Sequence, residues 1–353
     1  MVLTRRAAKA NKSIIRWLPN EILISVMLDV SRPGLIALCM TSRLMRNIAT
    51  ALLYRTVSLS NVPQIKAFLR TMKQRSSLSS PLSRHIRRFS ITDDEKPDLK
   101  LSPTIVKAIN SIFSQLSNLR FLELLIDEAI EFTDMLQHAY FPNLTSFEYT
   151  IEPQTSALLP LFLNRHPTLD DLTLAQRHPI ERLDPVHLPN LKCYSGPACF
   201  VPSLTLDRGC ISWVCLMWYQ RDLNVELPLL HLGRTTSPRS IIAIFPCDVL
   251  TESTILGGVG THLPHVRALQ FRKITGNTPI SHAETLEIAA HLKKLSCLST
   301  LDFFGDDDYG PVEHDTAADC ETIKLWGKAC KSLHSIVLNG AMWKRVHGRW
   351  VLK

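Results

Sequence analysis

A short apolar motif recurs along most of the chain and constrains the fold more than any other feature. It consists of three apolar residues spaced as in L-x-x-L-x-L, and it begins at Ile86, Leu119, Leu144, Leu169, Val201, Val266, Leu298 and Leu333, with a poorer copy at Leu191. The last two apolar residues alternate with another residue, so they share one face of a β-strand. Helix-like segments lie between the motifs at 128–139, 154–164, 281–294 and 316–330, and Ser281 with Glu284 has the spacing of a capping box.

A strand and a helix repeated in this way predict a parallel sheet in which each unit buries its apolar face against the next. The steps between the motifs at 119, 144, 169 and 191 are 25, 25 and 22 residues. We therefore expect an irregular α/β solenoid with a parallel sheet over residues 57–353. The pattern is weakest over 195–260, where we expect strands at Val201–Leu206, Trp213–Trp218 and Ser240–Pro246.

The last residues of the chain predict a β-hairpin that closes the array. The segment 342–351 has His347-Gly348 at its centre and one tryptophan on each side, Trp343 and Trp350. These two side chains could pair across the hairpin or cap the last repeat. A terminal cap is what a stacked array requires.

The amino-terminal quarter has a different pattern. After a basic tail over residues 1–13, which we expect to be disordered, the sequence predicts three short helices near 21–30, 35–40 and 41–53. Ser31-Arg32-Pro33-Gly34 breaks the first from the second. Three such helices carry more apolar residues than a free unit of about 40 residues can cover, so we expect another protein to cover them.

The segment 14–56 resembles an F-box. Its opening Leu18-Pro19-x-Glu21-Ile22-Leu23, the step Thr41-Ser42-Arg43, and the end Ile48-Ala49 with Leu52-Leu53-Tyr54-Arg55 match the family in order and spacing. Met45 stands where the family usually has an aromatic residue. The resemblance implies docking on a small acidic adaptor of the Skp type. The docking residues would be Leu18, Pro19, Ile22, Leu23, Val26, Met27, Leu35, Leu38, Cys39, Ser42, Met45 and Ile48.

The repeat motif is similar to the irregular leucine-rich repeats that often follow an F-box. Asn is mostly missing from its regular place in the repeat, which predicts a rough arc. Together the two resemblances imply a non-catalytic substrate receptor of an SCF-type ubiquitin ligase, with a cullin reached through the adaptor and an unknown protein target on the repeats. No cofactor, nucleic acid or membrane is implied.

Composition agrees with a folded protein of the cytoplasm or nucleus. No stretch is long and apolar enough to span a bilayer, and no signal-peptide pattern is present. The nine cysteines are scattered without a C-x-x-C pair, which predicts reduced core residues. Residues 1–92 hold 16 Lys/Arg and two acids, a charge of +14, whereas the whole chain has +8. This basic quarter suggests an acidic partner.

Catalytic and metal-binding patterns are largely absent from the sequence. Gly257-Gly258-Val259-Gly260 lacks the lysine of a phosphate loop and predicts a turn, and Pro264 keeps His262 and His265 from sharing a helix. Asp306, Asp307 and Asp308 follow a predicted strand, where they could bind a cation or a basic peptide of a target, or simply be solvated. Trp213, Trp218 and Tyr219 are expected in the core more than on a binding surface.

Three other functions remain open from the sequence alone. The amino-terminal helices could cap a leucine-rich scaffold that has no ligase partner. The basic quarter could bind nucleic acid, although it lacks interleaved aromatic residues. An enzyme of an unrecognised kind is the third alternative.

Overall fold

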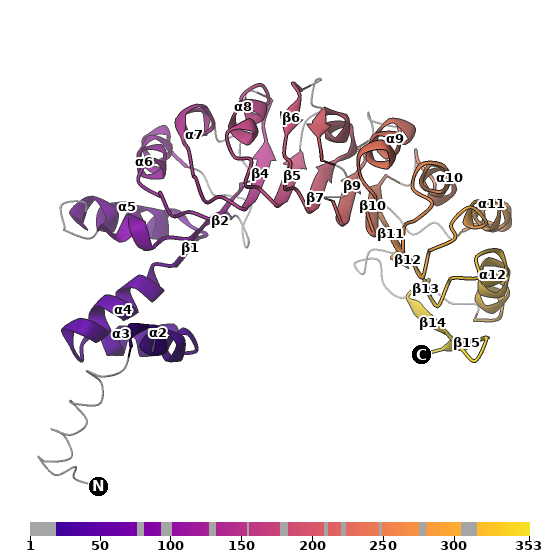
Figure 1. Ribbon diagram of the computed structural model, residues 1–353, viewed down its shortest axis with the longest axis horizontal. Coiled ribbons are helices and arrows are strands. Elements are labelled where there is room, and N and C mark those ends of the chain that lie inside the picture. Colours follow the sequence, from indigo (N-terminus) through magenta and orange to yellow (C-terminus); the bar gives the residue numbers. More distant parts are fainter. Residues whose placement is uncertain are drawn as a thin grey trace, which may run out of the picture.

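A computed structural model describes residues 19–75, 81–92, 101–126, 132–153, 155–176, 183–207, 211–219, 224–246, 249–274, 280–304 and 316–353. The strands line the inner side of an arc and the helices cover its outer side (Figure 1). Helices α2–α4 lie at one end of the arc, and strands β14 and β15 lie at the other (Figure 1).

Thirteen strands form one sheet whose order follows the chain. They are β1 (Thr56–Leu59), β2 (Arg88–Thr92), β3 (Phe121–Leu125), β4 (Ser146–Ile151), β5 (Asp171–Gln176), β7 (Cys193–Pro197), β9 (Trp213–Met217), β10 (Ser240–Phe245), β11 (Ala268–Lys273), β12 (Thr300–Phe304), β13 (Ser335–Leu338), β14 (Ala341–Val346) and β15 (Arg349–Leu352). All pairs from β1 to β13 are parallel, and only the last two pairs are antiparallel. The expected α/β fold with a large parallel sheet is confirmed.

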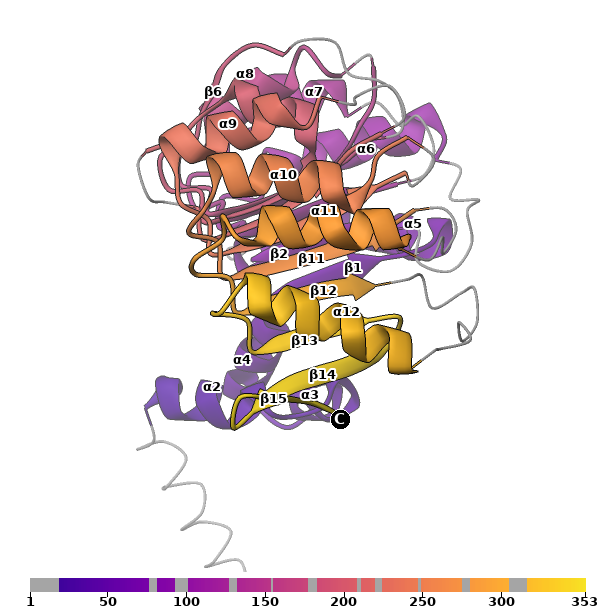
Figure 2. The ribbon, with the colours of Figure 1, turned by 90° about the vertical axis from the view of Figure 1, so that its right-hand side faces the viewer.

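Helices alternate with these strands. They are α2 (Asn20–Leu28), α3 (Arg32–Cys39), α4 (Arg43–Leu53), α5 (Val62–Arg75), α6 (Pro103–Phe113), α7 (Thr133–His138), α8 (Leu159–Asn164), α9 (Glu226–Thr235), α10 (Glu252–His262), α11 (His282–Leu292) and α12 (Thr316–Ala329), with short 3-10 helices η1 (Leu82–His85) and η2 (Ala198–Ser203). Helices α10, α11 and α12 run side by side over the strands (Figure 2). The predicted capping box is present at the start of α11, where Ser281 and Glu284 bond reciprocally.

The apolar motif holds the sheet in register. Leu122 of β3 pairs with Phe89 of β2 and with Phe147 of β4, and Phe147 pairs in turn with Leu172 of β5. All four side chains are buried, and they belong to one continuous core that reaches from Val57 to Trp343. Each motif therefore covers the apolar face of its neighbour, as the spacing predicts.

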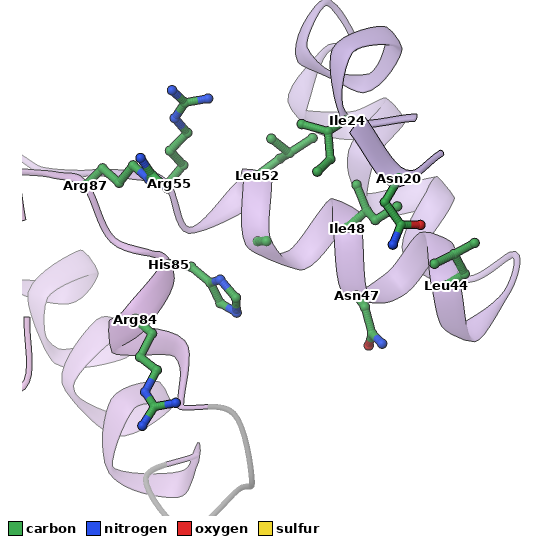
Figure 3. Close-up of a pocket in the computed structure, with 11 residues that line it drawn as sticks. Asn20, Ile24, Leu44, Asn47, Ile48, Leu52, Arg55, Arg84, His85 and Arg87 are labelled. Atoms are coloured by element: carbon green, nitrogen blue, oxygen red, sulfur yellow. The ribbon is translucent and has the colours of Figure 1, made fainter. Parts of the chain in front are cut away.

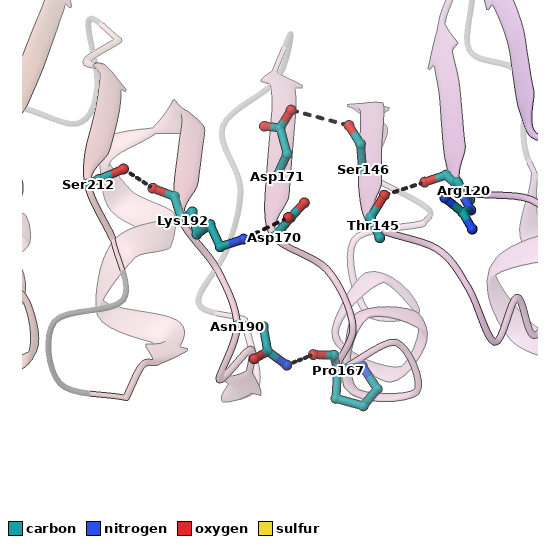
Figure 4. Close-up of polar contacts among 9 residues, drawn as sticks. All are labelled: Arg120, Thr145, Ser146, Pro167, Asp170, Asp171, Asn190, Lys192 and Ser212. Carbon is teal, nitrogen blue, oxygen red and sulfur yellow. Dashed lines mark hydrogen bonds and ion pairs between the residues drawn. The ribbon is translucent and has the colours of Figure 1, made fainter. Parts of the chain in front are cut away.

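A polar ladder runs along the edge where the strands begin. The carbonyl before each strand accepts two amides of the next unit, as Arg120 O does from Thr145 N and Ser146 N at 2.8 and 3.0 Å. Side chains just before the motifs add further bonds to the preceding unit, from Asn118 to Arg84 O, Asn143 to Ser117 O, Thr168 to Leu144 O, Asn190 to Pro167 O and Ser332 to Leu298 O. Figure 4 shows part of this ladder. Asn118, Asn143 and Asn190 stand directly before a motif, and Thr168 takes the same place once.

Several expected elements differ from the structure. The first half of the expected strand Val201–Leu206 lies in η2, where Pro202 lacks the amide that a central strand needs. Strand β8 (Leu204–Thr205) pairs with β6 (Val186–His187) in a separate two-stranded sheet. Strand β1 was not expected, although Tyr54, Val57 and Leu59 have the motif spacing. Residues 128–131 and 154, at the starts of two expected helices, lie outside the described residues.

The glycine cluster is not a turn but part of α10. A Cβ on Gly258 would lie 2.8 Å from Leu229 Cδ1 on α9, and one on Gly257 would lie 3.1 Å from the His291 ring on α11. The glycines therefore let α10 approach its two neighbouring helices closely.

The expected hairpin is formed by β14 and β15. His347 and Gly348 have positive φ angles of 49° and 80°, as a two-residue type I′ turn requires. Trp343 pairs with Leu352 instead of Trp350, so the two tryptophans do not face each other. Trp343 is buried in the main core and Trp350 packs on Gly327 of α12, so the hairpin caps the array.

Candidate protein-docking surface

Helices α2–α4 share a small core of their own. Its buried members are Leu23, Met27, Leu35, Ile48 and Ala49, and it is separate from the main core. Five buried side chains are few for a unit of three helices, so its stability depends on what covers the remaining apolar residues.

Helix α2 is apolar on nearly every side. Leu23 and Met27, four residues apart, face the small core, whereas Ile22 and Val26 are 49% and 64% exposed. Its sequence NEILISVML has only Asn20, Glu21 and Ser25 as polar residues. A helix this apolar is typical of a largely buried element, yet the flanks that carry Ile22 and Val26 have no cover within the described residues.

Helices α3 and α4 also carry exposed apolar side chains. Leu35 of α3 is buried, whereas Ile36 is 56% exposed and Met40, just after the helix, is 79% exposed. Ser42 caps α4 by accepting the Met45 amide at 3.2 Å, and Leu44 is exposed in its first turn. Pro33 and Gly34, which we expected between the first two helices, lie in the first turn of α3. The amide that Pro33 lacks costs nothing there, because the first amides of a helix have no partner within it.

The residues expected to dock on an adaptor fall into three groups. Pro19, Ile22, Val26 and Ser42 are exposed; Leu38, Cys39 and Met45 are half-buried; Leu23, Met27, Leu35 and Ile48 are buried in the small core. Leu18 lies outside the described residues. Five further exposed apolar residues were missed, namely Ile24, Leu28, Ile36, Met40 and Leu44. The signal for Ile24 and Leu28 is that α2 has only three polar residues. We name the seven exposed apolar residues at 22, 24, 26, 28, 36, 40 and 44 the helical apolar surface.

A pocket of about 480 Å³ lies between these helices and the start of the sheet, beside the contact of α4 with η1. Its helical side is formed by Asn20, Ile24, Leu44, Asn47, Ile48, Ala51 and Leu52, and its other side by Arg55, Arg84, His85 and Arg87 (Figure 3). His85 projects between η1 and α4 in Figure 3, and burial lowers its pKa.

The inner face of the sheet, which no helix covers in Figure 1, carries carboxyl groups near the middle of the arc. Glu148 on β4 is paired in register with Glu123 on β3 and lies near Asp171 on β5, whose carboxylate accepts from Ser146 at 3.3 Å (Figure 4). Burial, reinforced by Glu123 and Asp171, raises the pKa of Glu148 to about 7. Burial also raises the pKa of Asp302, on β12, to about 6.

Other candidate residues have structural roles or cannot be placed. Trp218 is fully buried, and Trp213 and Tyr219 are half-buried. His262 ends α10 and bonds to Glu226, whereas His265 is exposed three residues later. Asp306, Asp307 and Asp308 lie outside the described residues. Within the described ranges, no cluster of three His, Cys, Asp or Glu could hold a metal ion, and no helix is long and apolar enough to cross a bilayer.

No protein-family model matches the chain, and no curated protein matches it. The resemblances seen in the sequence therefore stay predictions.

Proposed function

We propose that the chain is the substrate-recognition subunit of an SCF-type ubiquitin ligase. In this proposal α2–α4 act as an F-box and dock on a Skp-type adaptor. The observation that carries it is the helical apolar surface. Among the described residues, seven of the 17 exposed large apolar side chains lie in this unit, six in the three helices and Met40 directly after α3. Such a concentration of exposed apolar side chains on one small unit marks a site of protein association.

The remainder of the chain, in this proposal, is an irregular leucine-rich-repeat solenoid that captures a protein target. In-register parallel strands and the Asn, Thr and Ser ladder support this assignment. A curved array offers an extended surface for a partner. Ubiquitin transfer would be carried out by other subunits, and this chain would raise the local concentration of the target near them.

The adaptor proposal is tested by co-expression with a Skp-type adaptor and size-exclusion chromatography. Ile22→Asp together with Val26→Asp should lower the adaptor affinity about 100-fold or more, because charged groups would be buried in an apolar contact. The matched control is Leu161→Asp with Leu286→Asp, two residues of α8 and α11 that are 56% and 50% exposed. It should co-elute as the unsubstituted chain does.

A scaffold without a ligase partner is the alternative, and one observation favours it. Helix α4 packs on η1 at the start of the sheet, as a terminal cap would. Under this alternative, the chain stays monodisperse alone and never co-elutes with the adaptor. That outcome would overturn the ligase proposal and leave the scaffold.

A further inference from the structure

The pocket between α4 and η1 joins two chemically different walls. On the helical side Ile24, Leu44 and Leu52 are apolar, and on the sheet side Arg55, Arg84 and Arg87 are exposed and basic. None of the described lining residues is acidic. None of the ion pairs among the described residues involves these three arginines.

The positive charge extends beyond the pocket along the edge where the strands begin. Arg55, Arg87 and Arg120 precede β1, β2 and β3, and the ladder bonds place them in successive units. Arg88 stacks its guanidinium over the Phe121 ring at 4.3 Å. Several positive charges beside a partly apolar pocket attract a negatively charged segment. The attraction is stronger in such a pocket than on a flat surface, because less water screens the charges.

The pocket is continuous with the helical apolar surface. Ile24 and Leu44 belong to both, so a protein that covers α2 and α3 reaches the pocket with its adjoining residues. The chain's own residues 1–18 are unsuitable occupants, because they carry Arg5, Arg6, Lys9, Lys12 and Arg16 and no acid. Like charges would repel them.

We infer that this pocket receives an acidic segment with an apolar side chain, contributed by the same partner that covers the helical apolar surface. The apolar side chain would lie on Ile24, Leu44 and Leu52, and the carboxylates would lie on the arginines. This inference rests on the proposed function, because the adaptor is its partner. A nucleic acid is less suited, because no Phe, Tyr or Trp lines the described pocket for a base to stack on.

The test is a titration of the purified full-length chain with a purified Skp-type adaptor at 50 and 500 mM salt. Arg84→Glu with Arg87→Glu should weaken binding about tenfold at low salt, and the difference should shrink at high salt as the charges are screened. Arg84→Lys with Arg87→Lys keeps the charge and should retain most of the affinity.

The matched control is Arg239→Glu with Arg267→Glu. Arg239 and Arg267 are exposed and precede β10 and β11 as Arg87 precedes β2, and these two strands lie far along the arc from β2 (Figure 1). The control should bind the adaptor as the unsubstituted chain does, and circular dichroism should show all variants folded. If the control loses as much affinity as the pocket variant, general charge and not the pocket is responsible, and the inference is wrong.

The remaining outcomes separate the inference from the proposed function. Unchanged binding by the charge-reversed pocket, with binding still lost in the Ile22→Asp and Val26→Asp variant, overturns the inference alone. No adaptor binding by the unsubstituted chain overturns both. A duplex oligonucleotide of 20 base pairs serves as a second probe. If the Arg84→Glu and Arg87→Glu variant no longer binds the oligonucleotide but still binds the adaptor, the pocket is a nucleic-acid site and the inference is wrong.

Discussion

His166 shows how one buried side chain joins two units of the arc. Its Nε2 accepts the Phe141 amide at 2.9 Å, and its Nδ1 donates to the Phe162 carbonyl at 2.7 Å. The side chain is 1% exposed and lies 4.2 Å from the Phe162 ring, centroid to centroid. Since Nε2 must accept, only the neutral ring fits this site. Burial accordingly lowers the pKa of His166 to about 4.

A pH dependence of stability follows from this site. Between pH 6.5 and about 4, the unfolded chain binds a proton at His166 that the folded chain does not, so the free energy of unfolding falls as the pH is lowered. The full loss is roughly 3 kcal/mol. Urea unfolding at pH 5 and 7.5 measures it, with His166→Gln as the variant that cannot titrate. An equal loss in both proteins would contradict this role.

For Glu148, on the sheet face opposite the helices, we predict a pH dependence of stability with the opposite sign. Its pKa of about 7 means that the folded chain holds a proton that the unfolded chain has released above its ordinary value of 4.5. Stability should therefore fall as the pH rises from 4.5 to 7. Glu148→Gln should unfold at a higher urea concentration than the unsubstituted chain at pH 8, and at the same concentration at pH 4.5. A lower midpoint at pH 8 would show that the charged carboxylate stabilises the sheet.

At the scale of elements, the terminal hairpin depends on a close contact with α12. A Cβ on Gly327 would lie 2.4 Å from Trp350 Nε1 and 2.8 Å from two other indole atoms. Gly327→Ala should therefore displace the hairpin and lower the free energy of unfolding by about 1–3 kcal/mol. In a Trp350→Ala background the same change should be nearly neutral. Chemical denaturation of the four proteins measures this coupling, and equal effects in both backgrounds would contradict the contact.

The elements that the sequence predicted well are those whose pattern is local. Leu122 and Leu124 have the alternation of a strand, and Ser281 with Glu284 has the spacing of a cap, so both were assigned correctly. Gly257 and Gly258 were misassigned to a turn. Glycine is needed at these positions of α10 because His291 and Leu229 approach them closely from other helices. Such contacts between distant segments leave no local pattern.

At the scale of the whole molecule, the arc could be predicted from the sequence. Which apolar residues of α2–α4 are buried and which are exposed could not. Repeat spacing indicated a parallel sheet, and the structure confirms it. The sequence placed Ile22 and Leu23 on one docking surface, whereas Leu23 is buried in the small core and Ile22 is exposed. Only the packing of three helices decides which apolar residues of α2 stay exposed. The basic pocket joins Arg55 to Arg84 and Arg87 from another unit, so no local motif indicates it.

The role of the helical apolar surface is tested most directly by amide hydrogen exchange of the full chain with and without a Skp-type adaptor. If α2–α4 dock on it, the amides of residues 20–53 should exchange more slowly in the complex, because their opening then requires dissociation. The amides of α8 and α11, on the outer side of the arc, should exchange at the same rates in both samples. Unchanged exchange over 20–53 at saturating adaptor, or protection confined to the arc, would contradict the proposed docking.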